Sequence, residues 1–310
     1  MQFAIHHPQI LYLISVPYIC TNSKAMLPDQ IDVDQVVPKV EKEMSFLDHL
    51  EELRWHLVRA ILSIVVIAVV IFLAKDFVFD SIIFAPKYKD FITYRAICNL
   101  SHAIGLGDSI CFFPPDFNFI TPVLGELFIT HIKTSIMLGV VLSFPYIFWE
   151  IWRFVRPGLY EKERTVTRGV VLICSTLFLL GVLFGYFVIS PFAVTFLAGY
   201  QIQGVTATPS LSSYVNYMIM FTVPAGLVFE LPMVVYFLAK VGLVTADFMR
   251  RYRRHSIVII LAVAAIVTPP DVMTQFLIGI PLYLLYEASI FIAVRIEKKQ
   301  AAKEMALEKK

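Results

Sequence analysis

Apolar residues in this chain gather in long, nearly uncharged blocks separated by polar segments. A block of about 18 to 25 residues is the length that crosses a hydrocarbon core of about 30 Å as a helix. The pattern therefore predicts an all-α integral membrane protein with six transmembrane helices, of which the fifth and sixth are short. The expected spans are at about 57–74, 128–148, 170–188, 215–239, 257–267 and 275–294.

The segments between the spans also have characteristic patterns. Residues 45–57 carry the apolar spacing of an amphipathic helix just before the first span. A long loop is expected from 75 to about 127. The third span should end at Ser190-Pro191, and an uncharged loop should follow from 192 to 213. Pro224 and Pro232 lie inside the fourth span and predict a kinked helix.

The fifth span is too short for an undistorted bilayer. Its 11 residues reach only about 16 Å at 1.5 Å per residue. Either the lipid is thinner there, or the fifth and sixth helices stop partway, or flanking polar residues complete the span.

The two ends of the chain differ from the middle. Residues 1–43 are expected to be a flexible N-terminal extension, since Asp29–Glu43 is acidic and polar. The alternative is that the natural start lies at Met26 or Met44. Residues 44–295 are expected to form the six-span membrane domain, and 296–310 a charged tail.

The placement of lysine and arginine predicts the orientation. Of 26 such residues, 20 lie in the segments on the N-terminal side of the membrane and 4 on the opposite side. Cytoplasmic loops carry the excess of positive charge. Both termini are therefore expected in the cytoplasm, with the membrane being the cytoplasmic (inner) one.

Composition and motifs argue against a soluble domain, a nucleotide-binding protein and a metalloprotein. The chain is 58% hydrophobic and 16% charged, against about 25% charged in soluble domains. It has no Walker A or GxGxxG sequence, so no nucleotide cofactor is expected. It also has no CxxC pair and no Cys/His cluster, so no metal is expected. Cys98 and Cys111 lie in the first external loop, where an oxidising compartment would permit a disulfide.

Several stretches together resemble the TatC family of twin-arginine protein translocases. They are His49–Arg54 (HLEELR), Ala85-Pro86, Phe144–Tyr146 with Trp152, Phe154, Pro157–Tyr160 and Glu163-Arg164, then Phe229–Pro232 (FELP), and finally Thr268–Asp271 (TPPD) with Gln275, Pro281 and Tyr286-Glu287. Their order and spacing match the family over nearly the whole of 45–294. The 43-residue extension and the longer first loop depart from it.

The resemblance implies a function. TatC-like proteins recognise twin-arginine signal peptides and help to move folded proteins across the membrane, driven by the proton gradient. They are not enzymes and carry no cofactor. The implied partners are single-span proteins of the TatA and TatB kind, the signal peptides of folded precursors, further copies in a larger complex, and the lipid bilayer, with no nucleic acid.

The resemblance also implies a signal-peptide site at Glu52 and Glu163, with Arg54 and Phe154 beside them. Two arginines in a ligand require acidic partners, and a carboxylate can pair with a guanidinium through two parallel hydrogen bonds. The alternative is that both glutamates are ordinary solvated charges, or that Glu52 pairs with His56 one turn on.

A second polar set lies at membrane depth. Glu230 is a lone carboxylate within the fourth span, and such groups are costly and usually functional. It is expected to bind a partner helix, or else to make an internal hydrogen bond. Asp271 and Gln275 join this set, although Asp271 would equally suit the N-cap of the sixth helix.

Two other function classes remain as rivals. Broken helices and an intramembrane glutamate suit a secondary transporter, but no internal repeat is visible. A membrane-embedded protease would need paired catalytic groups within its spans. The spans contain no paired aspartates, no Ser/His pair and no HExxH sequence.

Overall fold

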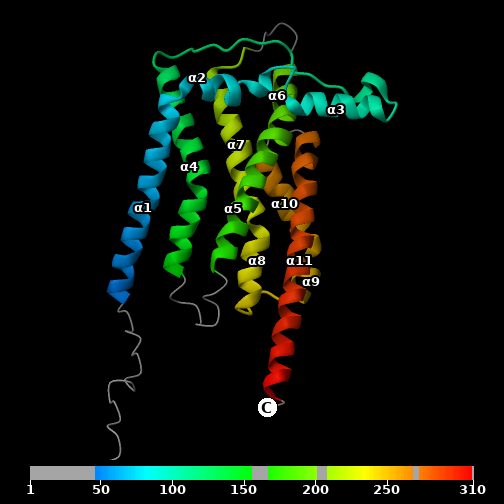
Figure 1. The fold of residues 1–310 in the computed structure, drawn as a ribbon. Coiled ribbons are helices and arrows are strands. Elements are labelled where there is room, and N and C mark those ends of the chain that lie inside the picture. The colour runs from blue at the N-terminus through cyan, green and yellow to red at the C-terminus, as the bar shows by residue number, and fades with distance from the viewer. Residues whose placement is uncertain (1–45, 156–166, 201–207, 268–271, 309–310) are drawn as a thin grey trace, which may run out of the picture. The chain divides into compact units, whose positions relative to one another are not determined.

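The protein is described by a computed structural model over residues 46–155, 167–200, 208–267 and 272–308. Phe46–Lys310 form one compact unit, and its described residues are helical or irregular, with one isolated bridge between Ile120 and Ser210. Long helices run side by side, and short helices lie across one end of them (Figure 1). The predicted extension, 1–43, lies outside the described residues.

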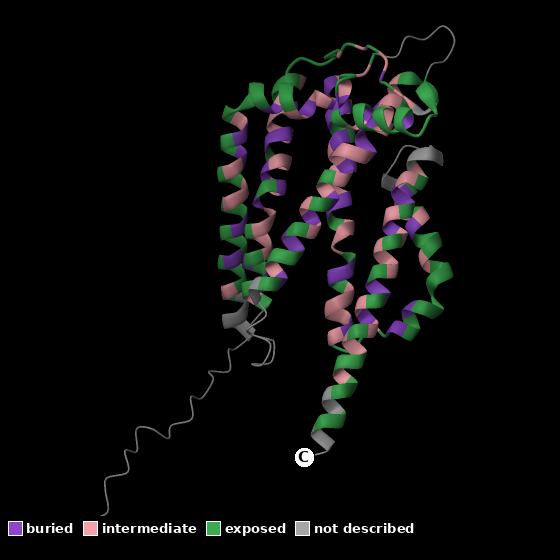
Figure 2. Cartoon of the chain, turned by 45° about the vertical axis from the view of Figure 1, so that its right-hand side comes forward, coloured by how far each residue is buried: buried purple, intermediate pink, exposed green. Residues whose placement is uncertain are grey.

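The long helices have the character of membrane spans. They are α1 (Phe46–Leu73), α4 (Glu126–Val155), α5 (Thr167–Phe184), α7 (Leu211–Phe229) and α11 (Val272–Glu308). Large apolar side chains such as Leu62, Val66 and Val70 of α1 are more than half exposed, and Figure 2 shows exposed positions along the length of the bundle. Apolar surface on this scale requires a non-aqueous surrounding. The prediction of an all-helical membrane protein is confirmed.

Five helical segments of the described chain are long and apolar enough to cross a membrane. They are Glu51–Leu73, Glu126–Val155, Gly169–Gly199, Leu211–Lys240 and Gln275–Ala302. The expected fifth span corresponds to α10 (Arg253–Val267), which has 15 residues and a length of about 22 Å. It is shorter than these five segments, as the sequence predicts, although it begins four residues earlier than expected.

The last helix extends beyond both ends of the expected sixth span, 275–294. Helix α11 has 37 residues and continues to Glu308 through most of the charged tail, 296–310. The residues after Val294 are mostly alanine, glutamate, lysine and glutamine, which favour helix wherever the chain is not interrupted. The tail is therefore an extension of the last helix.

Two expected loops also contain helices. Residues 75–125, expected as part of the first external loop, are called the external segment after that expectation. This segment folds as α2 (Lys75–Phe77), a π-helical turn η2 (Val78–Ile83), η3 (Ala85–Lys87), α3 (Ile92–Ala103) and η4 (Gly107–Ile110). The third span runs from α5 through η7 (Gly185–Ile189) into α6 (Ser190–Gly199). It therefore continues beyond Ser190-Pro191, into the segment expected as a loop. Pro191 lies in the first turn of α6, where a missing N–H costs nothing, so it does not end the span.

A buried tyrosine fixes the external helices to the bundle. Tyr94 of α3 donates its hydroxyl to the carbonyl oxygens of Pro86 and Pro191, at 2.9 and 3.2 Å. Burial raises the pKa of this phenol to about 12, so it stays a neutral donor at physiological pH. Helix α3 is thereby held against η3 and the start of α6.

The fourth span is divided at Glu230. Helix α7 ends there and α8 (Leu231–Lys240) begins, with Pro232 in its first turn. The predicted irregularity of this span is confirmed, and its main break lies at Glu230, because Pro224 is accommodated inside α7. After α8, a short helix α9 (Ala246–Arg251) is capped by Thr245, whose hydroxyl accepts from the N–H of Phe248.

Glycines let α5 and α7 pack closely. A Cβ added at Gly181 would lie 2.6 Å from the carbonyl oxygen of Ala225, and one at Gly185 2.5 Å from that of Phe221. On the facing helix, a Cβ at Gly226 would lie 2.8 Å from the ring of Phe178. Small residues at helix interfaces are the usual means of close packing in membranes.

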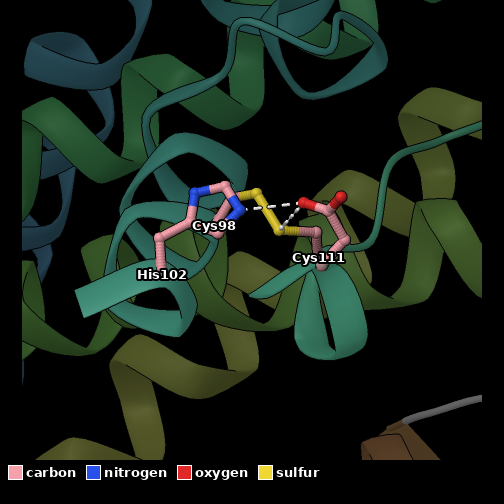
Figure 3. A group of neighbouring side chains, drawn as sticks. Cys98, His102 and Cys111 are labelled. Carbon is pink, nitrogen blue, oxygen red and sulfur yellow. Dashed lines mark hydrogen bonds and ion pairs between the residues drawn. A yellow bond between two sulfur atoms is a disulfide. The ribbon is translucent and has the colours of Figure 1, made fainter. Parts of the chain in front are cut away.

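A disulfide closes the end of the external segment. Cys98 of α3 and Cys111, which follows η4, are bonded with their Cα atoms 4.7 Å apart (Figure 3). His102 and Asp108 lie beside them, and His102 Nε2 is 2.8 Å from Asp108 Oδ1. Cys174 of α5 is a buried free thiol.

Removing this disulfide is expected to loosen the segment. Replacing Cys98 and Cys111 by serine should cost about 3 kcal/mol for a loop of this size in the chain-entropy model. The stability loss is measured as the fall in the temperature at which the detergent-solubilised protein aggregates. The disulfide itself is checked in the wild type by thiol labelling of the folded, unreduced protein, followed by mass spectrometry. Neither cysteine should react until a reductant is added, and free labelling of both would contradict the disulfide.

Candidate functional site

The first candidate site lies where α1 begins and α4 ends. Glu52, in the second turn of α1, keeps 37% of its side-chain surface exposed. One turn later, His56 is buried, and its Nε2 is 3.9 Å from Glu52 Oε1. The pairing with His56 that the sequence left as an alternative is therefore present, at a long distance. It leaves the carboxylate of Glu52 accessible to a ligand.

His56 is bound more closely by a residue of the facing helix. Its Nδ1 is 2.5 Å from Glu150 Oε2, and the two side chains are only 6% and 7% exposed. The carboxylate of Glu150 also accepts a hydrogen bond from Tyr146, and the charge of Arg59 acts on it. The imidazole also lies against the ring of Phe154 in an edge-to-face arrangement, with ring centroids 6.2 Å apart and planes at 61°.

The structure thus brings together two of the four residues assigned to the signal-peptide site. Glu52 and Phe154 both contact His56. Arg54 is exposed on the same turn of α1 as Glu52. Glu163 lies outside the described residues, as do its neighbours between α4 and α5.

Sequence reasoning missed Glu150. The apolar pattern predicts that the second span ends at 148, before Glu150, whereas α4 continues to Val155. The available signal was the pair Trp149-Glu150 within an otherwise apolar stretch, since a carboxylate so placed needs a buried partner. His56 was noted only as a neighbour of Glu52.

The second candidate site surrounds Glu230, between α7 and α8. Its carboxylate lies beside the thiol of Cys174 and the backbone of Phe178, both on α5. One oxygen, Oε1, is buried without a partner among the described residues. Gln275 is bonded elsewhere: its Nε2 donates to the carbonyl oxygen of Leu261 at 3.1 Å, which ties α11 to α10. Asp271 lies outside the described residues.

At Glu230, glutamine is expected to be tolerated better than alanine. An amide can still make a polar contact with the thiol of Cys174, whereas alanine leaves this buried thiol without a polar neighbour at that position; a lost buried hydrogen bond costs about 1–3 kcal/mol. The measurement is the yield of monodisperse protein, together with co-purification of single-span partners. Equal behaviour of the two variants would rule out a hydrogen-bonding role.

Cysteine and histidine side chains that form no cluster along the sequence do lie together in space. Cys98, His102, Asp108 and Cys111 offer ligand atoms within 4.8 Å of one another. Because the two sulfurs are bonded to each other, only the exposed His102 and Asp108 remain for a cation, and these pair with each other (Figure 3). Two such ligands fall short of the four of a structural zinc site.

A cavity of about 710 Å³ lies among α4, α5 and α7 beneath the external segment. Its wall is almost entirely apolar, with residues such as Met137, Leu183 and Met218, and Asp80 and Asp90 are its charged members. A site for a small polar solute needs several convergent polar groups. This cavity does not provide them at membrane depth.

Comparisons with known proteins agree with one another. Residues 48–281 match the family model described as "Sec-independent protein translocase protein (TatC)". The TatC of Blattabacterium sp. subsp. Periplaneta americana is 35% identical over 84% of this chain and 98% of its own length. That of Desulforapulum autotrophicum is 37% identical over 86% of this chain and 91% of its own.

Solved structures give the same result at the level of the fold. A crystal structure described as the twin arginine translocase receptor TatC in DDM superposes with a TM-score of 0.61 at 32% identity. The superposed region covers 79% of this chain and 99% of the solved chain. In sequence and in fold, this chain therefore belongs to the TatC family of Sec-independent protein translocase proteins.

Proposed function

We propose that this chain is the receptor subunit of a twin-arginine protein translocase, which binds the signal peptides of folded precursors and takes part in their transport. The observation that supports this most directly is an accessible carboxylate, Glu52, at the α1–α4 end of a fold similar to that of a twin arginine translocase receptor. Translocases of this family are transport proteins and not enzymes.

In this proposal, Glu52 and Glu163 pair with the two arginines of the signal peptide. Glu52 lies near the start of the first span, and Glu163 lies between the second and third. An even number of crossings separates them, so both are on one face of the membrane. Phe154 supplies an apolar contact beside the arginines, and the exposed Arg54 favours acidic groups of the peptide.

The second polar set is assigned to partners within the membrane. Glu230 has a buried oxygen without a partner among the residues that the structure describes, which suits a polar residue on a single-span helix of the TatA or TatB kind. Asp271 and Gln275 are also proposed to contact such partners, although the amide of Gln275 already donates to the carbonyl oxygen of Leu261. Self-association of the chain and transport driven by the proton gradient complete the proposal.

We further propose that α10 is a sixth membrane-crossing helix and that both termini lie in the cytoplasm, because 20 of 26 basic residues fall on that side. A reporter that is active only outside the cytoplasm should be inactive when fused after the last residue, and one that is active only inside should work. The opposite pattern would place the C-terminus outside the cytoplasm and contradict the topology proposed for this chain in the cytoplasmic membrane.

The rival classes differ from this proposal in what they bind. A secondary transporter should bind a solute, and the cavity among α4, α5 and α7 lacks the polar groups for one. A membrane protease should cleave its substrate.

The receptor function is tested by crosslinking purified protein to a labelled signal peptide with an Arg-Arg motif, or with Lys-Lys in its place. A receptor should prefer the Arg-Arg peptide by tenfold or more and leave it uncleaved, and it should co-purify with single-span partners. Equal crosslinking of both peptides would exclude the proposed recognition.

A further inference from the structure

The His56–Glu150 pair is unusual among the ion pairs of the described residues because both of its side chains are buried. The pair between Arg253 and Glu287, by contrast, is 45% and 30% exposed. A buried ion pair seldom stabilises a fold more than apolar residues of the same size would, because both charges lose their hydration. Stability alone therefore does not account for this pair.

The position of the imidazole suggests another role. Its Nδ1 side meets Glu150 on α4, and its Nε2 side faces Glu52 on α1. Its ring also contacts Phe154 in the last turn of α4. One buried side chain thus joins two residues of the proposed peptide site that are about 100 positions apart in the sequence.

We propose that His56 and Glu150 are positioning residues for arginine recognition: Glu150 fixes the imidazole, and the imidazole fixes the orientation of Glu52 and Phe154. This role presupposes the receptor function proposed above. A histidine whose one nitrogen is held by a carboxylate has its other nitrogen directed by that bond. Tyr146 and Arg59 act on the same carboxylate and so help to hold Glu150.

Orientation matters more for arginine than for lysine. A guanidinium donates two parallel hydrogen bonds in a fixed fork, so the carboxylate must present both oxygens in one plane. An ammonium group is a compact charge that accepts a carboxylate from many directions. Loss of the positioning pair should therefore weaken binding of the Arg-Arg peptide and leave binding of the Lys-Lys peptide nearly unchanged.

The decisive variant removes both charges together. Either single change leaves a buried group without its partner and can prevent folding, whereas His56→Leu with Glu150→Met replaces the pair by apolar side chains of similar size. We expect this double variant to accumulate normally but to lose about tenfold in the ratio of Arg-Arg to Lys-Lys crosslinking, which corresponds to about 1.4 kcal/mol. Two single variants that keep Glu150 add a further comparison. His56→Gln should prefer the Arg-Arg peptide more strongly than His56→Leu does, because the glutamine amide can still donate to Glu150.

A matched control removes an ion pair elsewhere. Arg253→Leu with Glu287→Leu eliminates the 2.7 Å pair between α10 and α11 and should leave the crosslinking ratio unchanged. If the His56–Glu150 double variant also keeps the wild-type ratio, the pair is merely structural and the inference is wrong. If instead the wild type itself shows no Arg-Arg preference, the receptor function fails, so the two failures are distinguishable.

Discussion

Glu52→Ala and Glu163→Ala are each expected to abolish the preference for Arg-Arg over Lys-Lys signal peptides, while insertion into the membrane stays normal. A hydrogen bond to a charged group contributes about 1.5–3 kcal/mol. At 1.4 kcal/mol per decade, losing one carboxylate should weaken Arg-Arg binding roughly tenfold to a hundredfold. Replacement by lysine should be worse than alanine, since it adds repulsion between like charges.

The measurement is crosslinking of purified protein to labelled peptide, normalised to the amount of folded protein. Glu51→Ala is the matched control, because Glu51 is an exposed glutamate on the same helix, next to Glu52. It should behave as wild type. A structural role for Glu52 would lower the protein's abundance and leave the remaining molecules selective. Unchanged selectivity in both variants would remove Glu52 and Glu163 from the site.

The sequence was a good guide to the spans and a poor one to their ends. Lipid demands about 20 consecutive apolar residues, and such blocks are visible without any knowledge of tertiary contacts. Helix ends depend on packing instead. Helix α4 continues to Val155, and Trp152 near its end is buried against Phe237, with ring centroids 4.9 Å apart. Glu150 thereby becomes a helical residue that faces α1.

The candidate site was predictable only in part for the same reason. Glu52 and Phe154 were found through motifs, and the proximity of Glu52 to His56 follows from helical spacing. The contact between His56 and Glu150 joins positions 94 apart, and no local pattern indicates it. In the external segment, likewise, the disulfide was suggested by cysteine spacing, but the approach of His102 and Asp108 depends on how α3 meets η4.

Gly181→Ala and Gly185→Ala are expected to destabilise the bundle although each adds one methyl group. The new Cβ atoms would lie 2.6 and 2.5 Å from carbonyl oxygens of α7, far inside van der Waals contact. Backbone atoms of a packed helix cannot rotate away, so α5 and α7 must separate. Overpacking of this kind typically costs about 1–3 kcal/mol. The two glycines face one interface, so the double variant should not be additive.

Gly169→Ala, on α5 with Gly181, is the control for this effect. A Cβ at Gly169 meets no atom within 4 Å, and alanine favours helix over glycine by about 1 kcal/mol, so this variant should be as stable as wild type or slightly more so. Stability is measured as the fraction of detergent-solubilised protein that stays monodisperse after heating. The Gly181 and Gly185 variants should aggregate at clearly lower temperatures than Gly169→Ala. If all three behave alike, α5 and α7 do not pack in solution as closely as these glycines allow.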